Sequence, residues 1–373
     1  MLKYVVKSAA GMLGLDIKKL NVASFRLESR GSTDPCGDVI LAKQVLNFTE
    51  NIDFFYEKQI IPPSLEIAGA WRLDLIARRK KQIDIYMSGN VNSVAQYHEN
   101  MFFNELIMGL WNYGYLHCEP KINRHAISNF LSDFESYAKI FPTLPFLVSD
   151  VPLPVWGHSN GTDIIRFTDI WHSIQANHLA DVALYIKKLK RTESLSYIEI
   201  GSGFGGLAEK LAVNSIFNKL VLIDIPHNLV TAYYYLGRCV GVEAISIVSS
   251  RSELERAYLD SSIYIILCPS CFYESVHNLS GPFIFGNFGS FSEMDYESIS
   301  FYLNGLPKDT HAIVQINSNE KSLNTGGHVE VSIDEFPITN DFVRIYGGQA
   351  TSSASSGGRY KTSIHIKAHH LGA

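Results

Sequence analysis

Cysteine is scarce in this sequence, and its positions exclude several classes of protein. The 373 residues include five cysteines, an odd number at scattered positions, so no disulfide framework is predicted. No run approaches the roughly 20 consecutive apolar residues that a membrane-spanning helix needs. Lys3 and Lys7 interrupt the apolar N-terminus, which is expected to form an amphipathic helix rather than a secretory signal. These absences predict a cytoplasmic protein without an integral membrane segment.

An excess of positive charge is also absent. The formal net charge of −5 at pH 7 argues against bulk binding of nucleic acid. One basic run covers residues 78–81, and we interpret it as the solvated C-terminal end of a helix that begins near Leu65. A patch for a membrane surface or an acidic partner is the alternative.

The apolar pattern changes near residue 193 and divides the chain. Residues 1–150 carry helical spacing, as in 64–79 and 95–115, and are predicted to form a helical N-terminal region. Residues 151–192 are predicted to form a connector that follows the prolines of 141–157 and leads into a helix over 168–190. Residues 193–373 alternate strands with helices, which predicts a Rossmann-like sheet, mostly parallel with an antiparallel C-terminal strand.

The elements of this α/β part follow from the apolar runs and their spacing. Strands are predicted over 196–200, 219–225, 262–268, 282–287, 311–317, 341–346 and 362–368. Helices are predicted over 205–213, 227–240, 251–259 and 293–305. The Gly/Ser-rich segment 347–358 is expected to be a flexible loop.

A glycine-rich turn follows the first of these strands. Gly201, Gly203 and Gly205 alternate after Glu199, a pattern that brings the backbone close to a ligand at a helix N-terminus. The same glycines fit a dinucleotide template and motif I of class I S-adenosylmethionine-dependent methyltransferases. A carboxylate at position 199 would repel a pyrophosphate but suits the cationic groups of S-adenosyl-L-methionine. The acid therefore favours the methyl donor.

A second acid ends the next strand. Asp224 lies at the strand end expected to face a ribose in either template. The alternative is that Asp224 caps the helix that begins at Pro226. The residues predicted to bind the cofactor are Glu199, Gly201, Ser202, Gly203, Gly205, Asp224, Ile225, Pro269 and Asn287.

Several segments resemble a bacterial family of sugar O-methyltransferases. The resemblance covers about residues 150–320 and is carried by these segments: Ile223-Asp224-Ile225-Pro226, Asn228-Leu229, 232–236, 289–294 with Tyr302, 315–317, and Pro152-Leu153-Pro154 with Gly161, Ile164 and Arg166. It implies S-adenosyl-L-methionine as cofactor and methyl transfer to a sugar hydroxyl, such as that of a surface polysaccharide precursor. The acceptor would be a small-molecule or lipid-linked sugar, bound under the N-terminal region, and a homo-oligomer is an open alternative.

Methyl transfer to a hydroxyl needs positioning and a base. The loops after the fourth and fifth strands should face the methyl group, which makes Glu293, Asn317 and His328 the candidate catalytic residues. Glu293 could instead cap a helix with Ser290 as N-cap, and His328 could be an exposed loop histidine without a role. Arg166 near the domain junction is interpreted as structural rather than acceptor-binding. No required metal is predicted.

Three other interpretations stay open. Cys268 and Cys271 form a C-x-x-C after an apolar strand, which is typical of redox proteins, although its late place in the α/β region argues against that role. The glycine turn also fits an NAD-dependent oxidoreductase, and a non-catalytic, cofactor-binding scaffold of a glycan assembly complex is a further alternative. Binding of NAD without S-adenosylhomocysteine would support the NAD-dependent oxidoreductase.

Overall fold

The computed structural model describes residues 27–30, 38–49, 80–103, 152–159, 164–321, 329–350 and 359–371. The statements that follow concern these residues. The expected helix over 64–79, the turn at 160–161 and His328 lie outside them.

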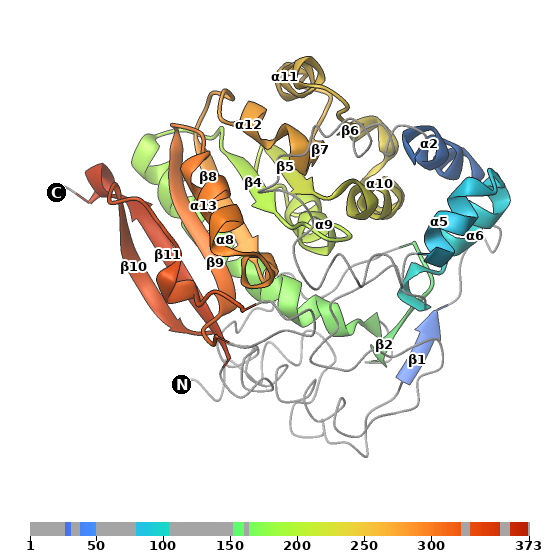
Figure 1. Ribbon diagram of the computed structural model, residues 1–373, viewed down its shortest axis with the longest axis horizontal. Coiled ribbons are helices and arrows are strands. Elements are labelled where there is room, and N and C mark those ends of the chain that lie inside the picture. The colour runs from blue at the N-terminus through green and yellow to red at the C-terminus, as the bar shows by residue number, and fades with distance from the viewer. Residues whose placement is uncertain are drawn as a thin grey trace.

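An eight-stranded sheet forms the centre of the molecule, in the order β10-β11-β9-β8-β4-β5-β7-β6 (Figure 1). Its strands are β4 (Ser196–Ile200), β5 (Lys219–Asp224), β6 (Ile245–Ile247), β7 (Ile265–Pro269), β8 (Phe283–Phe288), β9 (Thr310–Ser318), β10 (Phe342–Gln349) and β11 (Tyr360–Lys367). Strand β11 pairs antiparallel with both neighbours, and the other pairs are parallel. The predicted Rossmann-like sheet, with its antiparallel C-terminal strand, is confirmed.

Helices cover both faces of this sheet. Along β4, Tyr197 belongs to the apolar cluster under α8 (Phe167–Lys190), α9 (Gly206–Val213) and α10 (Pro226–Val240). The next residue, Ile198, belongs to the cluster under α11 (Arg251–Leu259), α12 (Tyr273–Val276) and α13 (Tyr296–Asn304). This alternation follows from the two-residue period of a strand. Strands buried on both faces explain the continuous apolar runs in the sequence.

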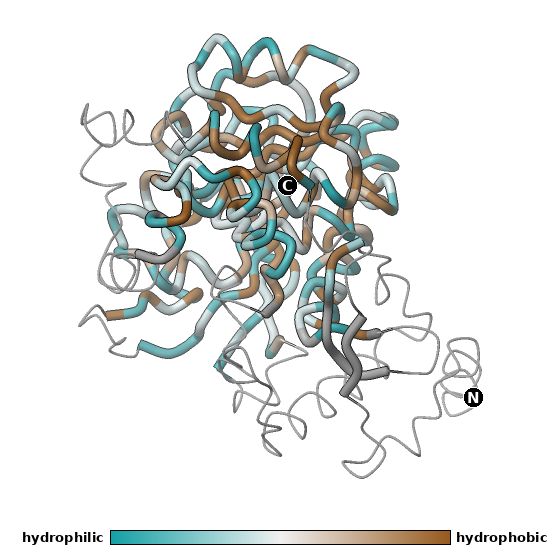
Figure 2. The backbone as a smooth tube through the Cα atoms, turned by 90° about the vertical axis from the view of Figure 1, so that its right-hand side faces the viewer, coloured by the Kyte–Doolittle hydropathy of each residue, from teal (hydrophilic) through white to brown (hydrophobic). Residues whose placement is uncertain are grey.

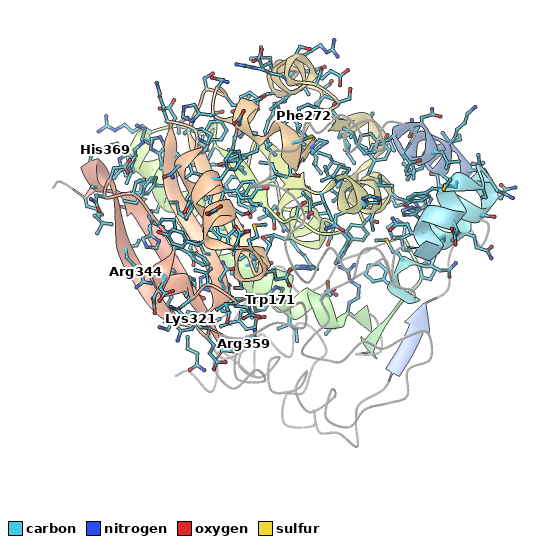
Figure 3. All side chains as sticks on the ribbon, in the orientation of Figure 1. Trp171, Phe272, Lys321, Arg344, Arg359 and His369 are labelled. Atoms are coloured by element: carbon cyan, nitrogen blue, oxygen red, sulfur yellow. The ribbon has the colours of Figure 1, made fainter. Side chains whose placement is uncertain are left out.

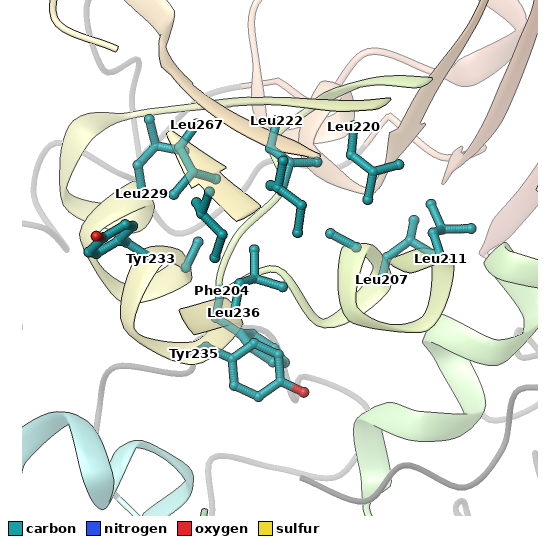
Figure 4. Packing of buried hydrophobic residues seen from close by; sticks show 14 of the residues in the cluster. Phe204, Leu207, Leu211, Leu220, Leu222, Leu229, Tyr233, Tyr235, Leu236 and Leu267 are labelled. Carbon is teal, nitrogen blue, oxygen red and sulfur yellow. The ribbon is translucent and has the colours of Figure 1, made fainter. Parts of the chain in front are cut away.

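The first of these clusters supports the glycine turn. Leucines of α9 and α10 pack against Leu220 and Leu222 of β5, and the rings of Phe204 and Tyr235 close the cluster beside them (Figure 4). The segments coloured as hydrophobic run through the middle of the molecule in Figure 2. The turn that follows β4 is therefore fixed between packed layers.

Three sequence predictions for the α/β part need correction. The edge strand β6 was not predicted, because three residues are too few to show a strand period. The helix expected over 293–305 begins only at Tyr296, after the short 3-10 turn η7 (Ser290–Glu293). Gly347 and Gly348 pair within β10 instead of starting a loop, while 351–358 lie outside the described residues.

The described N-terminal elements are β1 (Leu27–Arg30), α2 (Val39–Thr49), α5 (Lys80–Met87), α6 (Val91–Glu99) and η3 (Met101–Phe103). Helices α2 and α6 pack against α10, at the right of Figure 1. Strand β1 pairs antiparallel with β2 (Val155–Ser159), which pairs with β3 (Ile164–Ile165). The N-terminal region thus contains a strand that the sequence did not predict.

Two further expectations for this region are wrong. Lys80 and Lys81 begin α5 instead of ending a helix. Helix α6 ends at Glu99, capped by Asn100, so the helix expected over 95–115 is interrupted there. Helix α8 agrees with the predicted range 168–190 to within one residue, with lysines in its last turn as expected. Within the described part, no helix combines the length and the apolar character needed to cross a membrane.

Candidate functional site

The glycine turn lies where the strand order reverses, at the carboxyl end of β4. Gly201, Gly203 and Gly205 have φ angles of +75°, +56° and +86°, a left-handed conformation that side chains with a Cβ rarely adopt. A Cβ on Gly201 would also lie 2.2 Å from Ser290 Oγ. A Cβ on Gly203 would meet nothing within 4 Å. Gly203 therefore borders open space, into which a ligand can approach the backbone.

Helix α9 starts directly behind this turn. Its N-cap is Gly205, so no side chain caps the helix, and the positive end of its dipole is directed toward the turn. Gly206 has no positive φ, yet a Cβ there would lie 2.2 Å from His172 Cε1 and 2.7 Å from Phe204 Cζ. The fourth glycine is thus required by packing, whereas the first three are required by backbone conformation.

Glu199 is a buried acid without a hydrogen-bond partner at one of its oxygens. Its side chain lies near the end of β4 and is 4% exposed, and no described group donates a hydrogen bond to Oε2. Burial, together with the negative charge of Asp224, raises the pKa of Glu199 well above its usual range. A buried polar atom left without a partner is costly. This oxygen is therefore ready to accept a hydrogen bond from a ligand.

Asp224 at the end of β5 connects the turn to α10. Its carboxylate accepts hydrogen bonds from the Gly203 N–H at 2.7 Å, the Ile225 N–H at 2.7 Å and Asn228 Nδ2 at 2.8 Å. The N-cap of α10 is Ile225, with Pro226 at the first helical position, so the interpretation of Asp224 as the N-cap is wrong. Two other residues predicted to bind the cofactor are Pro269 and Ser202. Pro269 is the register partner of Asp224 on β7. Ser202, in the glycine turn, has a buried Oγ without a hydrogen-bond partner among the described residues.

Two asparagines hold the ends of β8 and β9 together. Asn317 Nδ2 donates to Asn287 Oδ1 at 3.0 Å, and Asn317 Oδ1 accepts from Ser292 Oγ at 3.2 Å. Asn287 Nδ2 donates to the Ile200 carbonyl at 2.9 Å. Both amides are fully buried. The structure thus brings Asn287 and Asn317 together and connects them to the strand that carries Glu199, through bonds that fix the backbone.

Glu293 ends the 3-10 turn η7 and is half-buried. The N-cap of α13 is Asp295, which accepts the Ser298 N–H at 2.7 Å, and the Ser290 hydroxyl donates to the Ile200 carbonyl at 3.0 Å. The expectation that Glu293 opens a helix capped by Ser290 is therefore wrong. Besides burial, the charge of Glu293 contributes to a raised pKa of Tyr360, which places the acid near the start of β11.

Side chains that no sequence pattern predicted lie beside Glu293. Trp171 of α8 and Tyr360 meet edge to face with ring centroids 5.7 Å apart, and Tyr360 pairs with Ser318 at the carboxyl end of β9. Arg359 forms an ion pair with Glu330 next to this aromatic pair. Figure 3 shows Trp171 and Arg359 close together at the end of the sheet. No periodicity connects residues 171 and 360, so only the fold could reveal the pair.

Four buried charges brace α8 against α9. Arg166 binds Asp169 through Nη2 at 2.6 Å and Tyr235 through Nη1 at 2.8 Å. Lys210 Nζ lies 2.9 Å from Asp169 Oδ1, and Glu209 lies 3.4 Å from Arg166 Nη2. The two cations and two carboxylates balance, as buried charges require. Arg166 is 3% exposed, which confirms its structural interpretation.

The C-x-x-C segment lacks the properties of a redox pair. Cys268 lies near the end of β7, and Cys271 lies in the 3-10 turn that follows this strand. Both are free thiols. Burial raises the pKa of Cys271 to about 11 and that of Cys268 still further. Reactive thiols of redox proteins have lowered pKa values. The redox interpretation is therefore disfavoured.

No protein-family model matches the chain, and no curated protein matches it significantly. Among solved structures it is similar to the mitomycin 7-O-methyltransferase MmcR, with 14% identity over 54% of this chain and 56% of that one and a TM-score of 0.32. The match therefore spans little more than half of MmcR. The magnesium protoporphyrin IX methyltransferase ChlM from Synechocystis PCC 6803, with bound S-adenosylhomocysteine, gives 11% identity over 63% and 93% of the chains and a TM-score of 0.33. TrmK of M. capricolum, in complex with the same product, gives 14% identity over 52% of this chain and 67% of that one, with a TM-score of 0.30. Such weak similarity carries no conclusion about activity, which has to be argued from the site itself.

Proposed function

We propose that the chain is an S-adenosyl-L-methionine-dependent O-methyltransferase that acts on a sugar hydroxyl, such as that of a surface polysaccharide precursor. The observation that carries the proposal is the Oε2 atom of Glu199, buried and without a partner beside a turn of left-handed glycines. A pyrophosphate at the same turn would face a buried acid, which is unfavourable for a dinucleotide.

The residues present fit the proposed cofactor. Glu199 would accept a hydrogen bond from the ammonium group of the methionyl part, whose charge would also favour the ionised carboxylate. Asp224 would accept from ribose hydroxyls, and the backbone at Gly203 would allow close approach. When bound, S-adenosyl-L-methionine supplies an electrophilic methyl group attached to a sulfonium.

The acceptor is proposed to bind beside Glu293 and the Trp171–Tyr360 pair. Aromatic faces pack against the apolar faces of sugar rings, while carboxylates accept hydrogen bonds from sugar hydroxyls. A carboxylate oxygen of Glu293 would take the proton from the acceptor hydroxyl as the oxygen is methylated. Asn317 would act through the backbone of β8 and η7 as a positioning residue. His328 stays a predicted base.

Residues 1–150 are proposed to form an acceptor cap, and residues 193–373 the cofactor-binding domain, joined by 151–192. Of the cap, helices α2 and α6 pack on α10, and Tyr234 of α10 donates to Glu99 of α6 at 3.0 Å. A cytoplasmic location, where nucleotide-linked sugars are made, completes the proposal.

Transfer of labelled methyl from S-adenosyl-L-methionine to nucleotide-sugar and lipid-linked glycan fractions tests this function. Glu293→Gln should lower turnover by about 100-fold or more, the usual contribution of a general base, without weakening S-adenosylhomocysteine binding. Glu297→Gln, the same change at an exposed position of α13, should leave turnover unchanged. Full turnover in Glu293→Gln would reject the assigned base. Failure of the wild-type protein to bind S-adenosylhomocysteine would reject the function as a whole.

A further inference from the structure

Three histidines lie close together at the end of the sheet opposite the glycine turn, where β9 begins and β11 ends. His311 is the second residue of β9, whose carboxyl end holds Asn317. His369 and His370 end the 3-10 turn η10 (Ala368–His370), which follows β11. Because β11 runs antiparallel to β9, with Ile366 opposite Ala312, its end returns to the start of β9. Figure 3 shows His369 far from Arg359 and Trp171.

The three imidazoles are close enough to share one ion. His370 Nε2 lies 2.8 Å from His311 Nδ1, and the rings of His369 and His370 have centroids 3.9 Å apart. One ligand nitrogen from each residue can be chosen so that all lie within 4.8 Å of one another. Nitrogen ligands of tetrahedral zinc are separated by about 3.3 Å when the Zn–N distances are about 2.0–2.1 Å. Rotation of the exposed His369 side chain can bring the set to that spacing.

Two cations and one acid surround the pair formed by His311 and His370. His311 is buried. Lys190 and Lys367 are the cations that face the pair, and Asp309 is the acid beside His311. The two lysines should limit the affinity, so we expect micromolar rather than nanomolar binding.

We propose that His311, His369 and His370 bind a divalent transition-metal ion, best matched by Zn²⁺, in a site that fastens the C-terminal turn to the start of β9. Imidazole ligands suit Zn²⁺, Cu²⁺ and Ni²⁺ rather than Mg²⁺ or Ca²⁺. Three protein ligands leave the fourth tetrahedral position to water. In the metal-bound state the ion takes the place of the hydrogen bond between His311 and His370, and the proton of that bond moves to the second nitrogen of the donating ring. Since the site is remote from the glycine turn, the proposal is independent of the proposed methyl transfer.

This site could not be predicted from the sequence. His311 and His370 are 59 residues apart, so they do not form a compact ligand motif. The sequence predicts no required metal, and the ion proposed here would stabilise the fold without being required for methyl transfer. What brings the ligands together is the antiparallel return of β11.

Titration of Zn²⁺ into metal-stripped protein tests the proposal, using the full chain without an added histidine tag. We expect one equivalent of Zn²⁺ to bind with micromolar affinity and to raise the unfolding temperature. His370→Ala and His369→Ala should each weaken that binding at least about tenfold and abolish the temperature shift. His277→Ala is the matched control, because His277 lies outside the cluster and contacts the Leu306 carbonyl.

Two outcomes would overturn the site. Absence of Zn²⁺ binding at a free Zn²⁺ concentration roughly 100-fold above a micromolar Kd would reject it. Equal binding by wild-type protein, His369→Ala and His370→Ala would assign the ion to other residues. Both positions are near the surface, so circular dichroism can establish that the variants are folded.

Discussion

Replacement of Asp169 by asparagine should destabilise the protein strongly, because this carboxylate compensates two buried cations. Asp169 is fully buried, with Arg166 Nη2 at 2.6 Å and Lys210 Nζ at 2.9 Å. Asparagine keeps the size of the side chain but removes its charge. Breaking a buried ion pair by neutralising one partner typically costs about 3–5 kcal/mol. We therefore expect the unfolding temperature to fall by roughly 4–6 °C, because a chain of this length unfolds with a large entropy.

The pH dependence of stability gives a second value for the contribution of the ionised Asp169 to the free energy of unfolding. Burial opposes ionisation of Asp169, but the charges of Arg166 and Lys210 outweigh it and lower the pKa from 3.8 to about 2. This corresponds to about 2 kcal/mol of stability, present above pH 3.8 and lost as the pH falls through 2. The value is smaller than the mutational cost because it counts only the proton equilibrium, whereas asparagine also leaves two cations poorly paired. The larger value therefore applies to the substitution.

Urea unfolding at pH 7 and at pH 3 measures both effects. The gap between wild type and Asp169→Asn should be large at pH 7 and smaller at pH 3. Asp181→Asn, the same change at an exposed position of α8, should stay within about 0.5 kcal/mol of wild type. If Asp169→Asn unfolds within about 1 kcal/mol of wild type at pH 7, the buried network does not brace α8 against α9.

Three further predictions concern the glycine turn and its surroundings. Gly206→Ala should cost about 1–3 kcal/mol in urea unfolding, since its Cβ would lie 2.2 Å from His172 Cε1; an unchanged midpoint would contradict this packing. Iodoacetamide should alkylate Cys271 at pH 8 about 100-fold more slowly than glutathione, because burial raises the pKa of Cys271 to about 11; equal rates would point to an activated thiol. Glu199 has a raised pKa in the folded state, so its contribution to stability is present at low pH and lost as the pH rises through that pKa. Unfolding experiments should therefore show that Glu199→Gln gains stability relative to wild type between pH 5 and pH 9, whereas parallel profiles would place Glu199 in water.

Patterns local in sequence predicted the sheet correctly. The strands that support Gly201 and Asp224 are apolar runs buried on both faces, and a two-sided parallel sheet requires such runs. The glycine turn was identifiable because its φ angles demand glycine. Prediction failed for elements without a clear apolar period. Strand β6 has only three residues, and the chain forms a 3-10 turn at Ser290–Glu293 before the helix starts at Tyr296.

Relations between distant residues could not be predicted. The buried group of Arg166, Asp169 and Lys210 joins two helices through charges that look solvent-exposed in the sequence. The pairing of Trp171 with Tyr360, and of His311 with His370, depends on how β11 returns beside β9. Such contacts are set by topology, which no local spacing records.

Calorimetric titration with S-adenosylhomocysteine and with NAD measures which cofactor the glycine turn binds. We expect micromolar binding of S-adenosylhomocysteine and no binding of NAD. Glu199→Gln should bind S-adenosylhomocysteine at least tenfold more weakly, roughly the contribution of one charge-assisted hydrogen bond. Glu297→Gln should bind like wild type. Binding of NAD without S-adenosylhomocysteine, or unchanged S-adenosylhomocysteine affinity in Glu199→Gln, would contradict the assignment of the glycine turn to a methyl donor.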